Sequence, residues 1–225
     1  MVKNFLVVAW RNLIRNRTSS LINIVGLAVG LAVAIVLGLW VWDEVTFDQY
    51  HKHYDRIAQV MQQQTTSGQI STQSGISFPM GRELQTNYRS DFTHIVMSSY
   101  AGSHILTAGN EHFDRFGVFM DKEAPELFSL KLKEGNYAAL SDPHSVIISQ
   151  TAAKVMFGDK EAMHQLLRID NKLDVQVTGV YEDLPQNTTL CGIQFIATWD
   201  LYKTSEQWII MADRQNQWDN NSFQL

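Results

Sequence analysis

Cysteine is nearly missing from this sequence, in which Cys191 is the only one among 225 residues. A single cysteine excludes an internal disulfide, and no Cys/His metal-binding pattern surrounds it. Free cysteines are usually buried as small apolar residues, and we expect Cys191 to lie in this way near a strand. The chain must therefore fold by packing alone, and 45% hydrophobic with 18% charged residues is an ordinary composition for a folded protein.

Sequence motifs that carry chemistry are also missing. The chain contains no GxxxxGK[ST] or GxGxxG phosphate loop, no GxSxG turn and no HExxH motif. His51 and His53 flank Lys52, but residues two apart face away from each other on a helix. Asp48 and Asp55 lie nearby, yet a specific metal site needs three or four converging ligands, so we interpret this segment as a solvated loop. The sequence predicts no enzyme activity, no catalytic residue, no metal and no cofactor, and any ATP must bind another chain.

Acidic residues are absent from the first 42 positions, where Lys3, Arg11, Arg15 and Arg17 supply four positive charges. All 23 acidic residues follow, together with the remaining 14 basic ones, so the rest of the chain is mildly acidic. An acidic surface repels phosphate groups, and this balance argues against a nucleic acid partner.

Leu21–Trp42 is a run of 22 residues without a charge, in which Asn23 is the only strongly polar side chain. As a helix it measures about 33 Å, enough to cross a hydrocarbon core of about 30 Å. A cleaved signal peptide has a shorter apolar region that ends in small residues. This run ends in Trp40 and Trp42, which suit the membrane interface, so we predict an uncleaved transmembrane helix.

The segment before this run predicts an amphipathic helix with a basic face. Apolar residues recur at helical spacing between Val2 and Ile14, and basic residues lie on the other side. Such a helix is suited to the cytoplasmic interface, although a simple basic flank that sets topology is the alternative. Positive charge stays in the cytoplasm, so we expect the N-terminus inside and the large domain outside. The residues assigned to topology and to the cytoplasmic interface are Lys3, Trp10, Arg11, Arg15 and Arg17.

Small residues recur every four positions in the apolar run, at Gly26, Gly30, Ala34 and Gly38. This spacing places them on one face of a helix, where a second helix can approach closely. We predict that the stripe packs against further transmembrane helices of the same or a second chain.

The sequence after Trp42 mixes strand and helix patterns without a regular repeat, which predicts an α+β domain. Two hairpins are expected, and an alternating pattern with a turn signal marks each of them. We further expect strands at 56–63, 92–100 and 145–148, and helices at 77–88, from Asp121 and at 152–157. The expected hairpins span 105–119 and 166–181.

The predicted organisation has three parts, which are an interfacial helix (1–18), a transmembrane helix (19–42) and an outer domain (43–225). Residues 217–225 begin with a loop and then start to alternate like a strand. We therefore expect the outer domain to be incomplete at its C-terminus and the chain to be a fragment of a longer protein.

Several ordered segments resemble the FtsX/MacB-like ABC transporter permeases, in the version found in Bacteroidetes. The similarity extends over nearly the whole chain, and one departure is Ala162–Gln165, where that family has a turn with proline and glycine. The matching segments are Trp10–Asn16, Ile22–Gly30, Asp43–Asp48, Tyr54–Ile57, Leu127–Gly135, Leu140–Pro143, Ser145–Ser149, Ala152–Asp159 and Val177–Pro185.

The resemblance implies a permease subunit, with its first transmembrane helix and a MacB-like periplasmic core domain, in the bacterial inner membrane. It also implies a cytoplasmic ABC ATPase whose ATP-driven movement reaches the periplasmic domain, and a periplasmic partner protein. The family's three remaining transmembrane helices lie outside this sequence. The alternatives are a single-span receptor or sensor with an extracytoplasmic ligand-binding domain, and an anchored enzyme. About 20 cytoplasmic residues are few for a signalling module, and no catalytic constellation supports an enzyme.

Overall fold

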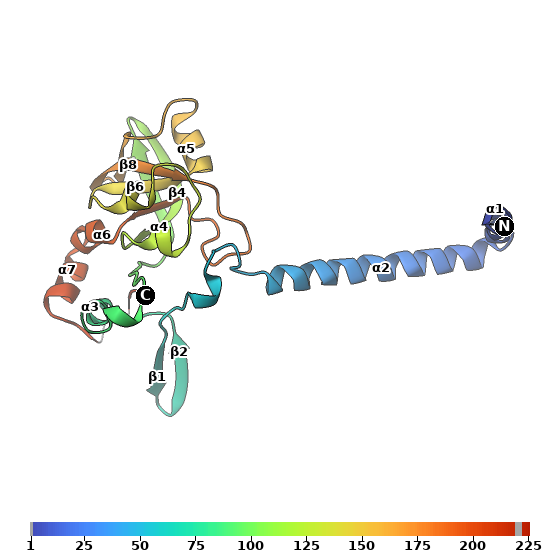
Figure 1. Cartoon of the computed structure of the whole chain (residues 1–225), viewed down its shortest axis with the longest axis horizontal. Helices are drawn as coiled ribbons and strands as arrows, with labels where there is room; N and C mark the ends of the chain where they lie inside the picture. Colours follow the sequence, from blue (N-terminus) through green and yellow to red (C-terminus); the bar gives the residue numbers. More distant parts are fainter. Residues whose placement is uncertain (1, 219–221) are drawn as a thin grey trace. The chain divides into compact units, whose positions relative to one another are not determined.

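The computed structural model describes residues 2–218 and 222–225, without the side chains of Val2, Lys3, Phe5, Thr66 and Asp213. The chain divides into two compact units, Met1–Phe47 and Asp48–Leu225. Figure 1 shows the first unit as helices and the second as a sheet with helices around it. We describe each unit by itself.

The first unit contains helix α1 (Val2–Arg15) and helix α2 (Arg17–Val45). The chain leaves helical geometry at Asn16, where φ is −109° and ψ is 55°. Helix α2 ends at Val45 because Thr46 caps it, with its backbone N–H and its hydroxyl both donating to the carbonyl of Trp42. The structure thus contains both of the helices that the N-terminal sequence predicts.

The second unit is a mixed α+β domain, and the predicted fold class is confirmed. Its strands are β1 (Gln62–Thr66), β2 (Gln69–Gln73), β3 (Gly102–Ala108), β4 (Glu111–Met120), β5 (Leu132–Glu134), β6 (Ser145–Ser149), β7 (Leu166–Ile169), β8 (Leu173–Tyr181) and β9 (Phe195–Thr198). Its helices are α3 (Phe78–Asn87), α4 (Ala124–Leu127), α5 (Gln150–Phe157), α6 (Trp199–Ser205) and α7 (Gln207–Arg214). Short 3-10 turns, labelled η1 to η3, cover Tyr54–Arg56, Arg89–Asp91 and Tyr137–Leu140.

The main sheet closes on itself. Its seven strands lie in the order β5-β8-β6-β9-β4-β3-β7, and β7 also pairs with β8. The pairing of β7 with β8, from Leu166–Gln176 to Ile169–Leu173, closes the sheet, and β7 also pairs with β3 through Leu106–Ile169 and Thr107–Arg168. Strands β8, β6, β9, β4, β3 and β7 therefore form a hydrogen-bonded ring, which leaves no free edge among these six. Strands β1 and β2 form a separate two-stranded hairpin that projects from the domain (Figure 1).

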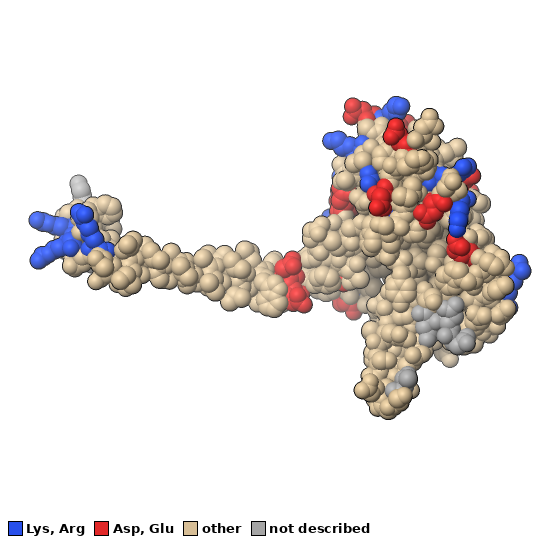
Figure 2. Space-filling view, turned by 180° about the vertical axis from the view of Figure 1, so that it is seen from behind, with Lys and Arg blue, Asp and Glu red and all other residues tan. Residues whose placement is uncertain are grey.

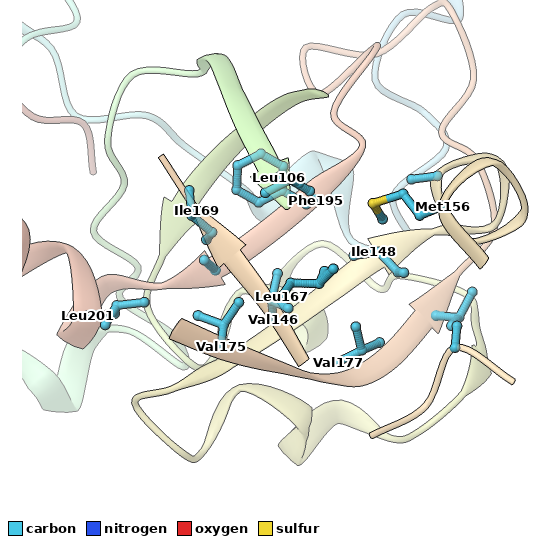
Figure 3. Packing of buried hydrophobic residues seen from close by; sticks show 14 of the residues in the cluster. Leu106, Val146, Ile148, Met156, Leu167, Ile169, Val175, Val177, Phe195 and Leu201 are labelled. Atoms are coloured by element: carbon cyan, nitrogen blue, oxygen red, sulfur yellow. The ribbon is translucent and has the colours of Figure 1, made fainter. Parts of the chain in front are cut away.

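The interior of the ring is the first hydrophobic cluster. Alternate residues of a strand face opposite sides, so Val146 and Ile148 of β6 enter this cluster, whereas Ile147 enters a second one. Figure 3 shows labelled side chains of β3, β6, β7, β8 and β9 meeting there, with Met156 of α5 beside them. Phe119 of β4 belongs to the same cluster. The residues labelled in that view are Leu106, Val146, Ile148, Met156, Leu167, Ile169, Val175, Val177, Phe195 and Leu201.

Two further clusters cover the outside of the sheet. The second is formed by outward-facing strand residues with Leu130, Leu140, Leu184 and Ile193. The third joins α3, α6 and α7 to the last described residues, through Ile76, Phe78, Met97, Trp199, Ile209, Ala212 and Phe223. Aromatic rings dominate it, with centroids 5.1 Å apart for Phe78–Phe223 and 5.5 Å apart for Trp199–Phe223.

Most of the elements that short sequence patterns predict are confirmed by the structure. These elements are both hairpins, β6, α3, α4 and α5. The strand predicted at 92–100 is wrong, because this segment is extended but pairs only through isolated bridges of Ser98. The strand predicted at 56–63 is also wrong, since residues 54–56 form a turn and β1 begins at Gln62. In the C-terminal segment Phe223 and Gln224 make isolated bridges to Ile76 and Ser98, and residues 219–221 lie outside the described residues.

Candidate functional site

Helix α2 is the one helix in the described part of the chain that is long and apolar enough to cross a membrane. It contains 29 residues with a peak mean hydropathy of 2.7, and none of its residues is buried. The leucine, valine and isoleucine residues of this helix are all at least half exposed. So much apolar surface is stable only in contact with lipid or other apolar helices, which agrees with a membrane span.

The four small residues predicted as a packing stripe all lie on α2. A methyl group built on Gly26, Gly30 or Gly38 meets no atom within 4 Å, and Ala34 is exposed. The face is therefore open in this chain, and its role in helix packing stays a prediction.

The basic residues predicted to set topology lie on α1 and at the start of α2. Trp10 is 66% exposed, and Arg11, Arg15 and Arg17 are exposed as well. Figure 2 shows blue side chains gathered at the N-terminal end of this unit and red ones at the other end of α2. The last turn of α2 contains Asp43 and Glu44. The side chain of Lys3 lies outside the described residues.

Asp48, the first residue of the outer domain, is held by a loop about 140 positions later in the sequence. Its Oδ1 accepts from the Thr188 hydroxyl at 2.7 Å and from the Thr189 N–H at 2.7 Å. Its Oδ2 accepts from the Thr189 hydroxyl at 2.5 Å, and its own N–H donates to the Asn187 carbonyl at 2.9 Å. Burial opposes ionisation of Asp48, but the bonds from Thr189 and Thr188 outweigh burial and hold its pKa below the usual value.

His51 extends this attachment to a second segment. It is 4% exposed, and its Nδ1 lies 2.7 Å from the Phe128 carbonyl oxygen while Nε2 lies 3.0 Å from the Thr188 hydroxyl. The interpretation of this region as a solvated loop is therefore wrong for His51. We call the six residues joined by these contacts the clasp. They are Asp48, His51, Phe128, Asn187, Thr188 and Thr189.

A cavity of about 460 Å³ lies elsewhere in the outer domain, between α3, α6 and the end of β4. Asp121 lines it, and its Oδ2 accepts from the Met97 N–H at 2.8 Å and from the Gln85 amide at 3.3 Å. Burial raises the pKa of Asp121 to about 6. The other lining residues are of mixed character and include Phe78, Arg82, Arg89, Lys122, Trp199 and Lys203.

Sequence reasoning did not single out the clasp or Asp121. Asp48 entered the sequence analysis only as an acidic neighbour of His51 and His53 and within the segment Asp43–Asp48, and its threonine partners follow a distant turn. Cys191 is only partly buried, and its thiol donates to Gln186 at 3.2 Å. Among the described residues, no group of three or more His, Cys, Asp and Glu side chains converges as a set of metal ligands.

The model of one protein family, described as MacB-like periplasmic core domain, matches residues 20–220. This chain belongs to that family. The match begins within the apolar helix and continues through the outer domain, so it spans both units. The family places the chain among the permeases of ABC-type transporters, which are not typically enzymes. Together with α2, the family indicates a membrane-anchored protein with an extracytoplasmic domain.

One solved structure shows the same fold at low sequence identity, and two others are similar over part of their length. A domain of a permease protein from Porphyromonas gingivalis is 18% identical, with a TM-score of 0.58 over 77% of this chain and 75% of that chain. The periplasmic region of MacB from Actinobacillus actinomycetemcomitans is 14% identical, with a TM-score of 0.46 over 67% of this chain and 78% of that one. The extracellular domain of the noncanonic ABC-type transporter YknZ from Gram-positive bacteria is 17% identical, with a TM-score of 0.46 over 67% and 72%. No curated protein matches the chain.

Proposed function

We propose that this chain is a permease subunit that couples ATP hydrolysis by a partner ABC ATPase to movement of its own outer domain. The observation that carries the proposal is the family match over residues 20–220. This match includes both the apolar helix and the outer domain. The sequence contains no phosphate-binding loop, so the proposal assigns hydrolysis to a partner ATPase.

The proposed arrangement places the N-terminus in the cytoplasm and the outer domain in the periplasm, with the helix in the inner membrane. Its parts are the interfacial helix (1–18), the transmembrane helix (19–42) and the periplasmic core domain (43–225). Basic side chains before the apolar run and acidic ones directly after it support this orientation. The amphipathic α1 then lies at the cytoplasmic face, where an ATPase can contact Trp10, Arg11 and Arg15.

Further transmembrane helices are proposed to pack against the small-residue face of α2. The open face at Gly26, Gly30, Ala34 and Gly38 supports this contact, because small side chains let helix backbones approach closely. These helices belong to the same permease or to a second copy of it. A periplasmic partner protein completes the proposed assembly.

Co-isolation tests the ATPase partner. The full chain, tagged and purified from native membranes, should retain a Walker-type ATPase. The double variant Arg11→Glu with Arg15→Glu should lose it, because both exposed cations lie on α1. The control, Lys122→Glu with Lys160→Glu, changes two exposed cations of the outer domain and should retain the ATPase. Purification without any ATPase under mild detergent conditions would overturn the proposal.

Thiol labelling tests the orientation, because Cys191 is the only cysteine. A maleimide that cannot cross the inner membrane should label Cys191 in cells whose outer membrane is permeable. In the variant Cys191→Ser with Asn4→Cys, the exposed position 4 should react only after the inner membrane is opened. The reverse pattern would place the outer domain in the cytoplasm.

The cavity at Asp121 favours the sensor as a second candidate function. Its volume of about 460 Å³ falls within the range of about 300–1,000 Å³ typical of ligand sites. A ligand that bound there would raise the melting temperature of wild type and not that of a cavity variant such as Trp199→Ala. The permease proposal predicts that the outer domain responds to the ATPase instead.

A further inference from the structure

The only covalent connection from α2 into the outer domain passes through Thr46 and Phe47 to Asp48. Helix α2 ends at Val45, and Asp48 already belongs to the outer domain. A displacement of the end of α2 that travels along the chain therefore enters the domain at Asp48. This residue is fastened on both its backbone and its side chain, by four hydrogen bonds to residues 187–189.

The hydrogens in the clasp can be assigned from its acceptors. The Thr188 hydroxyl has a single hydrogen, and the carboxylate of Asp48 takes it at 2.7 Å. The Nε2 of His51, 3.0 Å from the same hydroxyl oxygen, must then donate. Its Nδ1 also faces an acceptor, the carbonyl of Phe128. The same Nε2 lies 4.0 Å from Oδ1 of Asp48, so the His51 ring lies between Asp48 and Phe128.

The clasp holds the loop between β8 and β9. These two strands of the closed ring follow each other in the sequence but are not neighbours in the sheet. The loop residues Leu184 and Ile193 are buried in the second cluster, and the Tyr181 hydroxyl donates to the Ile193 carbonyl at 2.9 Å. At its start, Asp183 accepts from the N–H and hydroxyl of Thr151 on α5. Movement of residues 187–189 is therefore passed to β8, β9 and α5 at once.

We infer that the clasp is the joint that transmits displacement of the membrane helix into the strands of the outer domain. This inference rests on the proposed function, because it identifies where the ATP-driven movement enters the periplasmic unit. Asp48 receives the displacement and passes it to the loop between β8 and β9. His51 passes it to Phe128, which ends helix α4.

The decisive variant removes the donors and keeps the shape of the clasp. In Thr188→Val with Thr189→Val, both hydroxyls that bind Asp48 are lost while side-chain volume is nearly conserved. Hydrogen–deuterium exchange of the full chain in nanodiscs should become about tenfold faster for amides of residues 186–193. The matched control is Thr107→Val, which removes another threonine hydroxyl contact, to His112, near the turn of the β3–β4 hairpin. The control should leave exchange at 186–193 unchanged.

The second measurement adds the co-isolated ATPase and compares exchange with and without ATP. Wild type should show an ATP-dependent change at 186–193, and the double threonine variant should lose it while still binding the ATPase. Insertion of Gly-Ser-Gly-Gly between Thr46 and Phe47 should also abolish the ATP-dependent change in exchange, because a flexible linker then separates α2 from Asp48. Its exchange without ATP should match that of wild type, since the clasp is intact.

The outcomes separate this inference from the proposed function. Unchanged exchange in the double threonine variant would overturn the inference, whether or not an ATPase is found. An ATP-dependent change that survives in this variant would overturn the inference and leave the permease function standing. Absence of any ATPase would overturn the proposed function and the transmitted movement with it.

Discussion

The two units of the chain use the same aliphatic residues in opposite ways. In α2, leucine, isoleucine and valine side chains are exposed all around the helix, and none of its residues is buried. In the outer domain the same residue types alternate along strands, and Val146, Ile147 and Ile148 are completely buried. Hydrophobic content alone therefore does not distinguish a core from a membrane span. The period of the pattern and its length make the distinction.

The largest effect is expected from a truncation inside the ring. Phe195 is completely buried, and its ring lies over Gly117, where an added methyl group would be 2.1 Å from a ring carbon. Phe195→Ala should lower the free energy of unfolding of the outer domain by about 3–5 kcal/mol. Chemical denaturation of the full chain in detergent, followed by tryptophan fluorescence, measures this value. The comparison would fail if Leu31→Ala in α2, where Leu31 is 54% exposed, had an equal effect on the same transition.

A charge in the middle of α2 should have the next largest effect. Val33→Arg should raise the free energy of membrane insertion by about 2.5–3.5 kcal/mol, because lipid cannot solvate the guanidinium group. Its control is Val155→Arg in the outer domain, where Val155 is 53% exposed, as Val33 is, but faces water. The fraction of chain recovered in washed membranes should fall for Val33→Arg only. Equal recovery of both variants would argue against a membrane span.

A pH-dependent effect on stability is expected at Asp121. Burial raises the pKa of this carboxyl group from 3.8 in the unfolded chain to about 6. Because the folded pKa is the higher one, this carboxyl group contributes fully to stability below about pH 4. That contribution is lost as the pH rises to about 6. Asp121→Asn keeps an acceptor for Met97 and does not ionise, so it should be about 1–3 kcal/mol more stable than wild type at pH 7. Denaturation at pH 3.5 and pH 7 checks this, and an equal difference at both values would refute the assignment.

The smallest effect is expected on the small-residue face. Gly30→Ile should weaken association between copies or with partner helices by about 0.5–1 kcal/mol, because a branched side chain keeps backbones apart. The same substitution at a position on the opposite face, Ala28→Ile, should change association less. Energy transfer between labelled chains in vesicles measures both. Equal effects would show that the stripe is not a packing face.

Sequence reasoning succeeded in the outer domain where the signals are local. The hairpin of β7 and β8 was predicted because a turn separates alternating residues, and Val175 and Val177 are indeed buried. Helix α5 was predicted from Ser149, whose hydroxyl accepts from the Ala152 N–H as an N-cap does. Neither prediction needed knowledge of distant parts of the chain.

The predictions failed where distant contacts decide the structure. Asp48 and Thr188 lie 140 positions apart, so no local pattern could pair them. His51 looked like part of a polar loop, yet it is buried by contacts with residues 77 and 137 positions away. The strand expected at 92–100 has suitable residues, but only Ser98 finds a backbone partner on each side.

The position of β9 in the ring affects how the domain matures during export. Strand β9 comes last of the ring strands in the sequence, yet it lies between β6 and β4. It pairs with β4 through Gly117–Phe195 and its neighbours, and with β6 through Ile147–Ile196. Until residue 198 has crossed the membrane, β4 and β6 each retain an unpaired edge that is prone to aggregation. A nascent outer domain therefore keeps these two strand edges exposed until nearly all of this sequence has been translocated.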